Sequence, residues 1–244
     1  MKPLFLLALA TPLFAADCAG LAKLALPDAK ITLAQAIPAG AFTPPSGRPI
    51  PNLPAFCRVA ATLTPTPDSD IRLEVWLPAK WNTHFLGLGN GGFAGSISYG
   101  PLADSIRRGF AAASTDTGHV ASPEATWALN HPEKITDFGH RAIHLMTVQA
   151  KALATAHYGK APQKSYFSSC SNGGRQALME AQRYPTDYDG IIAGAPANAW
   201  TTLMTTAAKN MQATGRDLSA YIPAAKLPAI QAAALLACDQ LDGV

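Results

Sequence analysis

A serine flanked by small residues is the feature of this 244-residue sequence that most directly suggests chemistry. Ser171 lies in the stretch SSCSNGG (168–174), between an apolar run and a run of helical character. This stretch approximates the G-x-S-x-G pattern of a nucleophile elbow, where a sharp strand-to-helix turn presents the serine hydroxyl above a sheet. Ser169 replaces the first glycine of the pattern, and Gly174 adds room for close helix packing. The pattern predicts Ser171 as a catalytic nucleophile.

A serine nucleophile needs N–H donors for the oxyanion that forms when it attacks a carbonyl group. The residue after the nucleophile, Asn172, supplies one donor at the positive end of the helix dipole. The second donor comes from the loop after an earlier strand. The glycine-rich stretch GNGGFAG (89–95) is the candidate loop, because glycines let a backbone approach a substrate closely. We favour Gly91 or Gly92 as the donor.

Two other interpretations of the stretch are open. Ser171 could cap the helix that follows, but capping explains one serine and not the small residues around it. Cys170 could be the nucleophile, but it lies one residue before the turn. A thiol in an oxidising compartment also tends to be paired.

The elements that must position these residues alternate along the chain. Apolar runs predict strands and helical spacing predicts helices. The order is strand 71–78, a strand that runs into a glycine-rich loop over 84–95, a strand that ends in a polar loop over 109–119, helix 137–159, strand 164–170, helix 173–185 and strand 188–196. This order predicts an α/β fold with a mostly parallel sheet and helices on both faces. The proline-dense residues 38–67 are expected to lie extended over a surface. We assign 17–200 to the catalytic domain, and 201–244, rich in Ala and Thr, to the start of a helical lid.

Composition excludes several other classes of protein. The chain has 48% hydrophobic and 14% charged residues, enough apolar content for one sizeable core. Its formal net charge is +3, and no basic stretch is long enough to follow a phosphate backbone, so nucleic acid is not an expected partner.

The N-terminus predicts export. A lysine at position 2, an apolar run and small residues near Ala16 are typical of a secretory signal peptide, here assigned to 1–16. No other stretch is long and apolar enough to cross a membrane, so a secreted or periplasmic protein without membrane association is expected. Four cysteines in an exported chain are disulfide candidates, with three pairings if all partners lie in this chain. A Cys18–Cys57 bond would hold the proline-dense segment.

The block YFSSCSNGGRQALMEAQRYPTDYDGIIAGAPANAW (166–200) closely resembles the tannase and feruloyl esterase family. This family of α/β-hydrolases also contains mono(2-hydroxyethyl) terephthalate hydrolase. GNGGFAG and three further stretches match as well: STDTGH (114–119), ITDFGHRAIHLMTVQAKAL (135–153) and ACDQLDGV (237–244).

The resemblance implies roles for particular residues. Ser171 is the nucleophile, and Cys170 forms a disulfide with a cysteine next to the catalytic histidine. The partners of Cys170 and of Cys238 are both expected outside this chain. A structural calcium ion in the lid is bound by the family's loop, whose ligands here are Asp239, Asp242 and the carbonyl oxygen of Val244. Carboxylates and a carbonyl oxygen suit this hard cation, and catalysis itself needs no cofactor.

The acid and the histidine of a triad follow the serine in α/β-hydrolases. The family places both beyond the lid, so this chain resembles the N-terminal half of a longer enzyme and is expected to be inactive by itself. Asp116 and His119 follow a strand, but we expect the stretch 114–119 to shape its loop through hydrogen bonds to backbone. His140 and His144 lie four apart on a helix without the glutamate of a zinc-protease motif.

The primary hypothesis is an exported serine carboxylic-ester hydrolase that cleaves small aromatic acid esters, feruloyl, galloyl or related, through an acyl-serine intermediate. A non-catalytic binding module on the same scaffold is one alternative. A serine hydrolase of other specificity is another.

Overall fold

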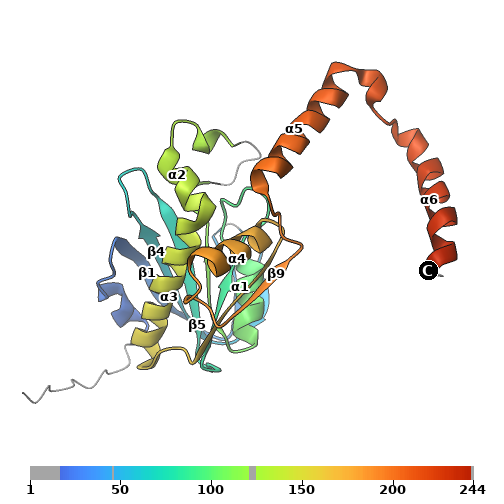
Figure 1. Ribbon diagram of the computed structural model, residues 1–244. Coiled ribbons are helices and arrows are strands. Elements are labelled where there is room, and N and C mark those ends of the chain that lie inside the picture. The colour runs from blue at the N-terminus through green and yellow to red at the C-terminus, as the bar shows by residue number, and fades with distance from the viewer. Residues whose placement is uncertain (1–16, 46, 121–124, 243–244) are drawn as a thin grey trace, which may run out of the picture. The chain divides into compact units, whose positions relative to one another are not determined.

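The computed structural model describes residues 17–45, 47–120 and 125–242, so the predicted signal peptide 1–16 lies outside the described residues (Figure 1). The chain divides into two compact units, one that ends at Ala197 and one from Asn198 to Val244. The second unit contains helices α5 (Trp200–Arg216) and α6 (Leu227–Asp242). No helix of the described residues is long and apolar enough to cross a membrane.

The first unit is built on a seven-stranded sheet. Its strands, in spatial order, are β1 (Ala29–Ile37), β4 (Phe56–Leu63), β5 (Ile71–Pro78), β7 (Ala111–Thr115), β6 (His84–Leu88), β8 (Lys164–Cys170) and β9 (Gly190–Gly194). Strands β7, β6, β8 and β9 pair in parallel, whereas β5, β4 and β1 continue the sheet with antiparallel pairs. Since β4 is antiparallel to β5, it points the same way as the four parallel strands. The prediction of a mostly parallel α/β sheet is confirmed.

Helices cover both faces of the sheet. On one face, α1 (Tyr99–Arg107) buries Leu102 and Ile106 beside Trp76. On the other, α3 (Ala142–Tyr158) packs against β5, which presents Leu73, Val75 and Leu77 there, and α4 (Asn172–Arg183) packs against β8 and β9. Successive side chains of β5 point to opposite faces of the sheet, and from Leu73 onward those on both faces are buried, as expected for a strand that helices cover on both sides.

The predicted helix at 137–159 is present and consists of a π-helical turn, Asp137–Arg141, followed by α3. A short helix, α2 (Pro132–Thr136), precedes the π-helical turn. Gly159 ends α3 in a left-handed conformation with φ 70°. This position favours glycine because it has no Cβ, so the stop signal in the sequence is a physical one.

The expectation for residues 38–67 was wrong in part. Strands β2 (Gly40–Phe42) and β3 (Ile50–Leu53) form a small separate sheet, but Phe56–Leu63 is β4, an internal strand of the main sheet. No proline lies between Pro54 and Pro65, so β4 contains none and every backbone N–H of this strand remains available for pairing. The edge strand β1 was not predicted at all.

One predicted disulfide, Cys18–Cys57, is confirmed, and it closes a sequence separation of 39 residues. Cys57 lies in β4, and Cys18 precedes a short 3-10 helix, Ala19–Lys23, whose Leu21 is buried in the core. The bond therefore holds the described N-terminal end against the sheet, and it reduces the conformational entropy of the unfolded chain.

Asp116 organises the loop after β7. Its carboxylate Oδ1 accepts hydrogen bonds from the backbone N–H groups of Arg72, at 2.9 Å, and Gly118, at 2.8 Å. Its carbonyl oxygen accepts from the N–H of Gly95, at the end of the glycine-rich loop. Asp116 is 7% exposed, and burial raises the pKa of its carboxyl group from 3.8 to about 7.

We predict that Asp116→Asn changes the pH dependence of stability. The folded-state pKa lies above the unfolded-state pKa, so stability falls as pH rises from about 4 to about 7. Asparagine retains the acceptor oxygen and removes this ionisation. Relative to the original chain, the variant should gain about 3 kcal/mol of unfolding free energy between pH 5 and pH 8. Urea denaturation at the two pH values measures the gain.

The control for this experiment is Asp104→Asn, since the Asp104 side chain is 74% exposed. Its stability difference from the original chain should be the same at both pH values. An equal difference at pH 5 and pH 8 for Asp116→Asn would show that the carboxyl group ionises normally.

Candidate functional site

Ser171 lies at the turn between β8 and α4, as the elbow pattern predicts. Its backbone has φ 61° and ψ −123°, a conformation that residues other than glycine seldom adopt. Such strain costs about 1–3 kcal/mol and persists only where the surroundings hold it. Here the N–H of Ser171 donates to the carbonyl oxygen of Gly194, and its own carbonyl oxygen accepts from the N–H of Ala197. The end of the neighbouring strand β9 therefore maintains the turn.

The hydroxyl group of Ser171 is not used as a helix cap. Ser171 immediately precedes α4, but its side chain makes no capping hydrogen bond, and the residue is exposed. The capping interpretation of Ser171 is therefore wrong. An exposed hydroxyl group on a strained strand-to-helix turn is what the nucleophile interpretation requires.

Missing side chains let the first turn of α4 approach the sheet. A Cβ added to Gly173 would overlap the hydroxyl group of Ser169 and lie 2.5 Å from the Ser169 Cβ. A Cβ added to Gly89, at the end of β6, would lie 2.8 Å from both the Gly173 Cα and the Ser169 Cβ. Ser169, which replaces the usual glycine of the motif, thus fits because Gly173 and Gly89 have no side chain.

The glycine-rich loop lies beside the elbow. The N–H of Asn90 donates to Oε1 of Gln176 in α4, at 3.0 Å, and Nε2 of Gln176 donates back to Oδ1 of Asn90, at 3.2 Å. The next residues, Gly91 and Gly92, are exposed, and a Cβ added to either would have no atom within 4 Å. The structure therefore brings the loop next to the first turns of α4 and leaves these glycines uncovered.

A buried arginine that sequence reasoning missed fixes Asn172. Nε of Arg175 donates to Oδ1 of Asn172, at 2.7 Å, and its other nitrogens donate to the carbonyl oxygens of Phe138 and Gly139. Burial lowers the pKa of Arg175 to about 10. Asn172 and Arg175 lie three residues apart in a helix, and this i, i+3 spacing was the signal in the sequence from which their contact could have been predicted. Arg175 ties the elbow to the π-helical turn and adds positive charge near it.

The upstream histidines are bonded to groups other than Ser171. Nε2 of His119 lies 2.7 Å from the carbonyl oxygen of Phe93, and its ring stacks on Trp127. His140 is bonded to Tyr184 and His144 to Asp187. Together with the backbone contacts of Asp116, this supports a loop-shaping role for 114–119.

The other predicted site residues are the two remaining cysteines and the calcium ligands. Cys170 and Cys238 are exposed free thiols. Asp239 and Asp242 fall in the last turns of α6, and Val244 lies outside the described residues, so the calcium site stays a prediction. A cavity of about 700 Å³, bordered by Leu86, Tyr166 and Ile192, does not include Ser171 or the two glycines. Chemistry at the elbow therefore depends on its own surroundings and not on that cavity.

We predict that Gly173→Ala destabilises the chain by about 1–3 kcal/mol, because the new methyl group overlaps Ser169. The matched control is Gly100→Ala, which also changes the second residue of a helix but places its methyl group in open space. Urea denaturation should show no loss for this control, since alanine favours helix. Adding Ser169→Gly to the Gly173→Ala variant should restore most of the loss. No recovery in the double variant would place the constraint elsewhere.

Comparison with known proteins identifies the family. The family model described as tannase and feruloyl esterase matches residues 57–244. An uncharacterized esterase of Xanthomonas campestris pv. campestris is 48% identical over 236 residues, covering 96% of this chain and 41% of that protein. A probable feruloyl esterase B-1 of Aspergillus fumigatus is 38% identical and covers 77% of this chain and 36% of its own length.

The crystal structure of feruloyl esterase B from Aspergillus oryzae superposes with a TM-score of 0.86 at 34% identity, covering 93% of this chain and 46% of that chain. The chain thus spans less than half the length of each of these relatives. The α/β-hydrolase-type fold and the relationship predicted from the elbow block are both confirmed. The chain belongs to the tannase and feruloyl esterase family.

Proposed function

We propose that this chain carries the nucleophile and the oxyanion donors of an exported serine carboxylic-ester hydrolase that acts on small aromatic acid esters. The observation that carries the proposal is the backbone of Ser171, which is strained at φ 61° while its side chain is exposed and makes no capping bond. The glycine-rich loop beside it supplies the second half of an oxyanion site. The names of the relatives, feruloyl esterases and an esterase, support the reaction class and the aromatic substrate.

In the proposed reaction, Oγ of Ser171 attacks the ester carbonyl carbon and its proton passes to a histidine. The carbonyl oxygen becomes an oxyanion that accepts hydrogen bonds from the N–H groups of Asn172 and of Gly91 or Gly92. The first N–H groups of α4 have no partner within the helix, and the helix dipole adds positive potential there. Collapse of the intermediate releases the alcohol, and water then cleaves the acyl-serine to release the aromatic acid.

The proposal assigns the base and the acid of the triad to residues outside these 244. His119, His140 and His144 are all bonded to other groups, and Asp116 is occupied by backbone N–H groups. The exposed thiol of Cys170, directly before the nucleophile, suits a disulfide to a cysteine beside the incoming histidine. Such a bond would fix the base next to the serine it deprotonates.

Export and calcium binding complete the proposal. The Cys18–Cys57 disulfide and the N-terminal sequence both support a secreted or periplasmic protein. The predicted calcium ligands Asp239, Asp242 and Val244 would stabilise the lid without taking part in the chemistry.

We predict that Ser171→Ala in the full-length enzyme lowers kcat for methyl ferulate or methyl gallate by about a thousandfold or more. Thr32→Ala is the matched control, since it removes an exposed hydroxyl group from β1, the edge strand opposite β9, and should leave turnover unchanged. A panel of aromatic and aliphatic esters, measured by product release, tests the substrate class.

Two results would contradict the proposal. Ordinary turnover by the Ser171→Ala enzyme would exclude this serine as the nucleophile. Ordinary turnover by the 244-residue chain alone would exclude a base located outside it.

A further inference from the structure

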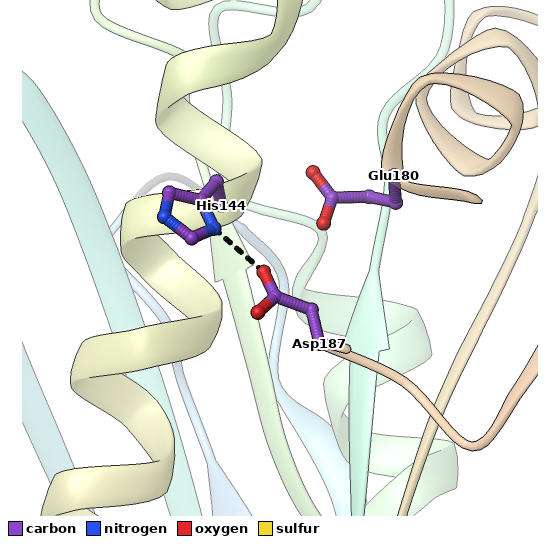
Figure 2. Close-up of side chains that lie close together, drawn as sticks. All are labelled: His144, Glu180 and Asp187. Atoms are coloured by element: carbon purple, nitrogen blue, oxygen red, sulfur yellow. Dashed lines mark hydrogen bonds and ion pairs between the residues drawn. The ribbon is translucent and has the colours of Figure 1, made fainter. Parts of the chain in front are cut away.

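A histidine and two carboxylates meet on the side of α4 that faces α3, away from the elbow. Figure 2 shows His144 of α3, Glu180 of α4 and Asp187 of the segment after α4 with their side chains directed toward one another. One ligand atom from each residue lies within 4.8 Å of the others. Nδ1 of His144 and Oδ2 of Asp187 are 2.6 Å apart. None of the three has a part in the proposed ester hydrolysis.

Glu180 is the unusual member of the group. It is 0% exposed, and within the described residues neither of its carboxylate oxygens accepts a hydrogen bond from a donor group. Burial, and then the charge of Asp187 and a hydrogen bond shared with the Asp187 carboxylate, raise the pKa of Glu180 to about 8. Leaving a carboxylate buried with no partner is costly, and each such group in a native structure requires an explanation. A bound cation would supply the missing partner.

The surroundings favour a cation on grounds of charge. Lys151 of α3 carries an ammonium group whose charge acts on Glu180, but it donates to the backbone carbonyl oxygen of Asp187 and lies 5.5 Å from the centre of the Tyr188 ring. When Glu180 is ionised, two carboxylates face this one ammonium group, and the net negative charge favours a bound cation. The ring of Tyr184 stacks on that of His144 with 3.8 Å between centres, and so fixes the plane of the imidazole.

We propose that His144, Glu180 and Asp187 bind a divalent transition-metal ion, with Zn²⁺ as the best match. One imidazole nitrogen and two carboxylate oxygens form a ligand set that zinc accepts, with water in a fourth position. Two ligands of one tetrahedral zinc ion lie roughly 3.3 Å apart. The separations of up to 4.8 Å in the group would therefore have to shorten, and the 2.6 Å pair of His144 and Asp187 would have to open and exchange its hydrogen bond for the metal. Asp187 is 9% exposed and the His144 side chain 28%, so the ion can enter from solvent.

The role of such a site would be structural. Glu180 follows Ser171 by nine residues, about 14 Å along the axis of a helix, which is too far for the ion to touch a bound ester carbonyl. The ion would join α3, α4 and the segment leading to β9. These are the elements whose ends hold the elbow, so the metal would stabilise the frame of the site and not the transition state.

The test is zinc binding to chain that has first been depleted of metal with a chelator and dialysed. Competition with a chromophoric chelator should give one Zn²⁺ per chain. Glu180→Gln keeps the shape of a protonated glutamate and should weaken binding by about tenfold or more. His144→Phe keeps the ring stacked on Tyr184 and should do the same. In thermal unfolding, Zn²⁺ should raise Tm of the original chain and of neither variant.

His131→Ala is the matched control, because His131 forms a similar pair with Asp68. Among the described residues, no second carboxylate lies close enough to this pair to complete a group of three metal ligands. This variant should bind Zn²⁺ as the original chain does. Equal binding by the original chain, Glu180→Gln and His144→Phe would assign the metal to the exposed thiols or to chance contacts, and would overturn the proposal. Absence of binding, or binding of Ca²⁺ and Mg²⁺ as tight as that of Zn²⁺, would overturn it as well.

Discussion

The close approach of the first turn of α4 to the ends of β6 and β8 is the constraint on which the candidate site depends. Gly173 and Gly89 lack the side chains that would prevent it, and Ser169 fills the space they leave. Because the helix begins so close to the sheet, the chain has to turn sharply at Ser171, in a conformation with positive φ. The strain, the exposed hydroxyl group and the adjacent helix N-terminus are consequences of this one packing arrangement.

The rest of the first unit supports this turn from two sides. The carbonyl oxygen of Gly194 accepts the N–H of Ser171, and the exchange of hydrogen bonds between Asn90 and Gln176 places the glycine-rich loop against α4. Behind the helix, Arg175 joins it to the turn before α3. These hydrogen bonds hold the backbone around Ser171 and Asn172 in place, and oxyanion stabilisation requires donors that are positioned in advance.

Local signals made much of this structure predictable. The elbow at Ser171 and the helix stop at Gly159 depend on residues close together in the sequence, and the alternating elements gave the sheet type. Strand β4 was missed because the prolines before Pro54 dominated the interpretation of residues 38–67. The group of His144, Glu180 and Asp187 could not be predicted, because it joins two helices and a loop through tertiary packing. No spacing rule relates those positions.

The central claim is that the Oγ of Ser171 becomes covalently bonded to the substrate. Its most direct measurement is mass spectrometry of the folded full-length protein after reaction with a fluorophosphonate, followed by peptide mapping. A single adduct on the peptide that contains Ser171, lost when the protein is first unfolded, is the result that a strained and activated serine predicts. A folded protein that forms no adduct, or forms it on another serine, would contradict the account.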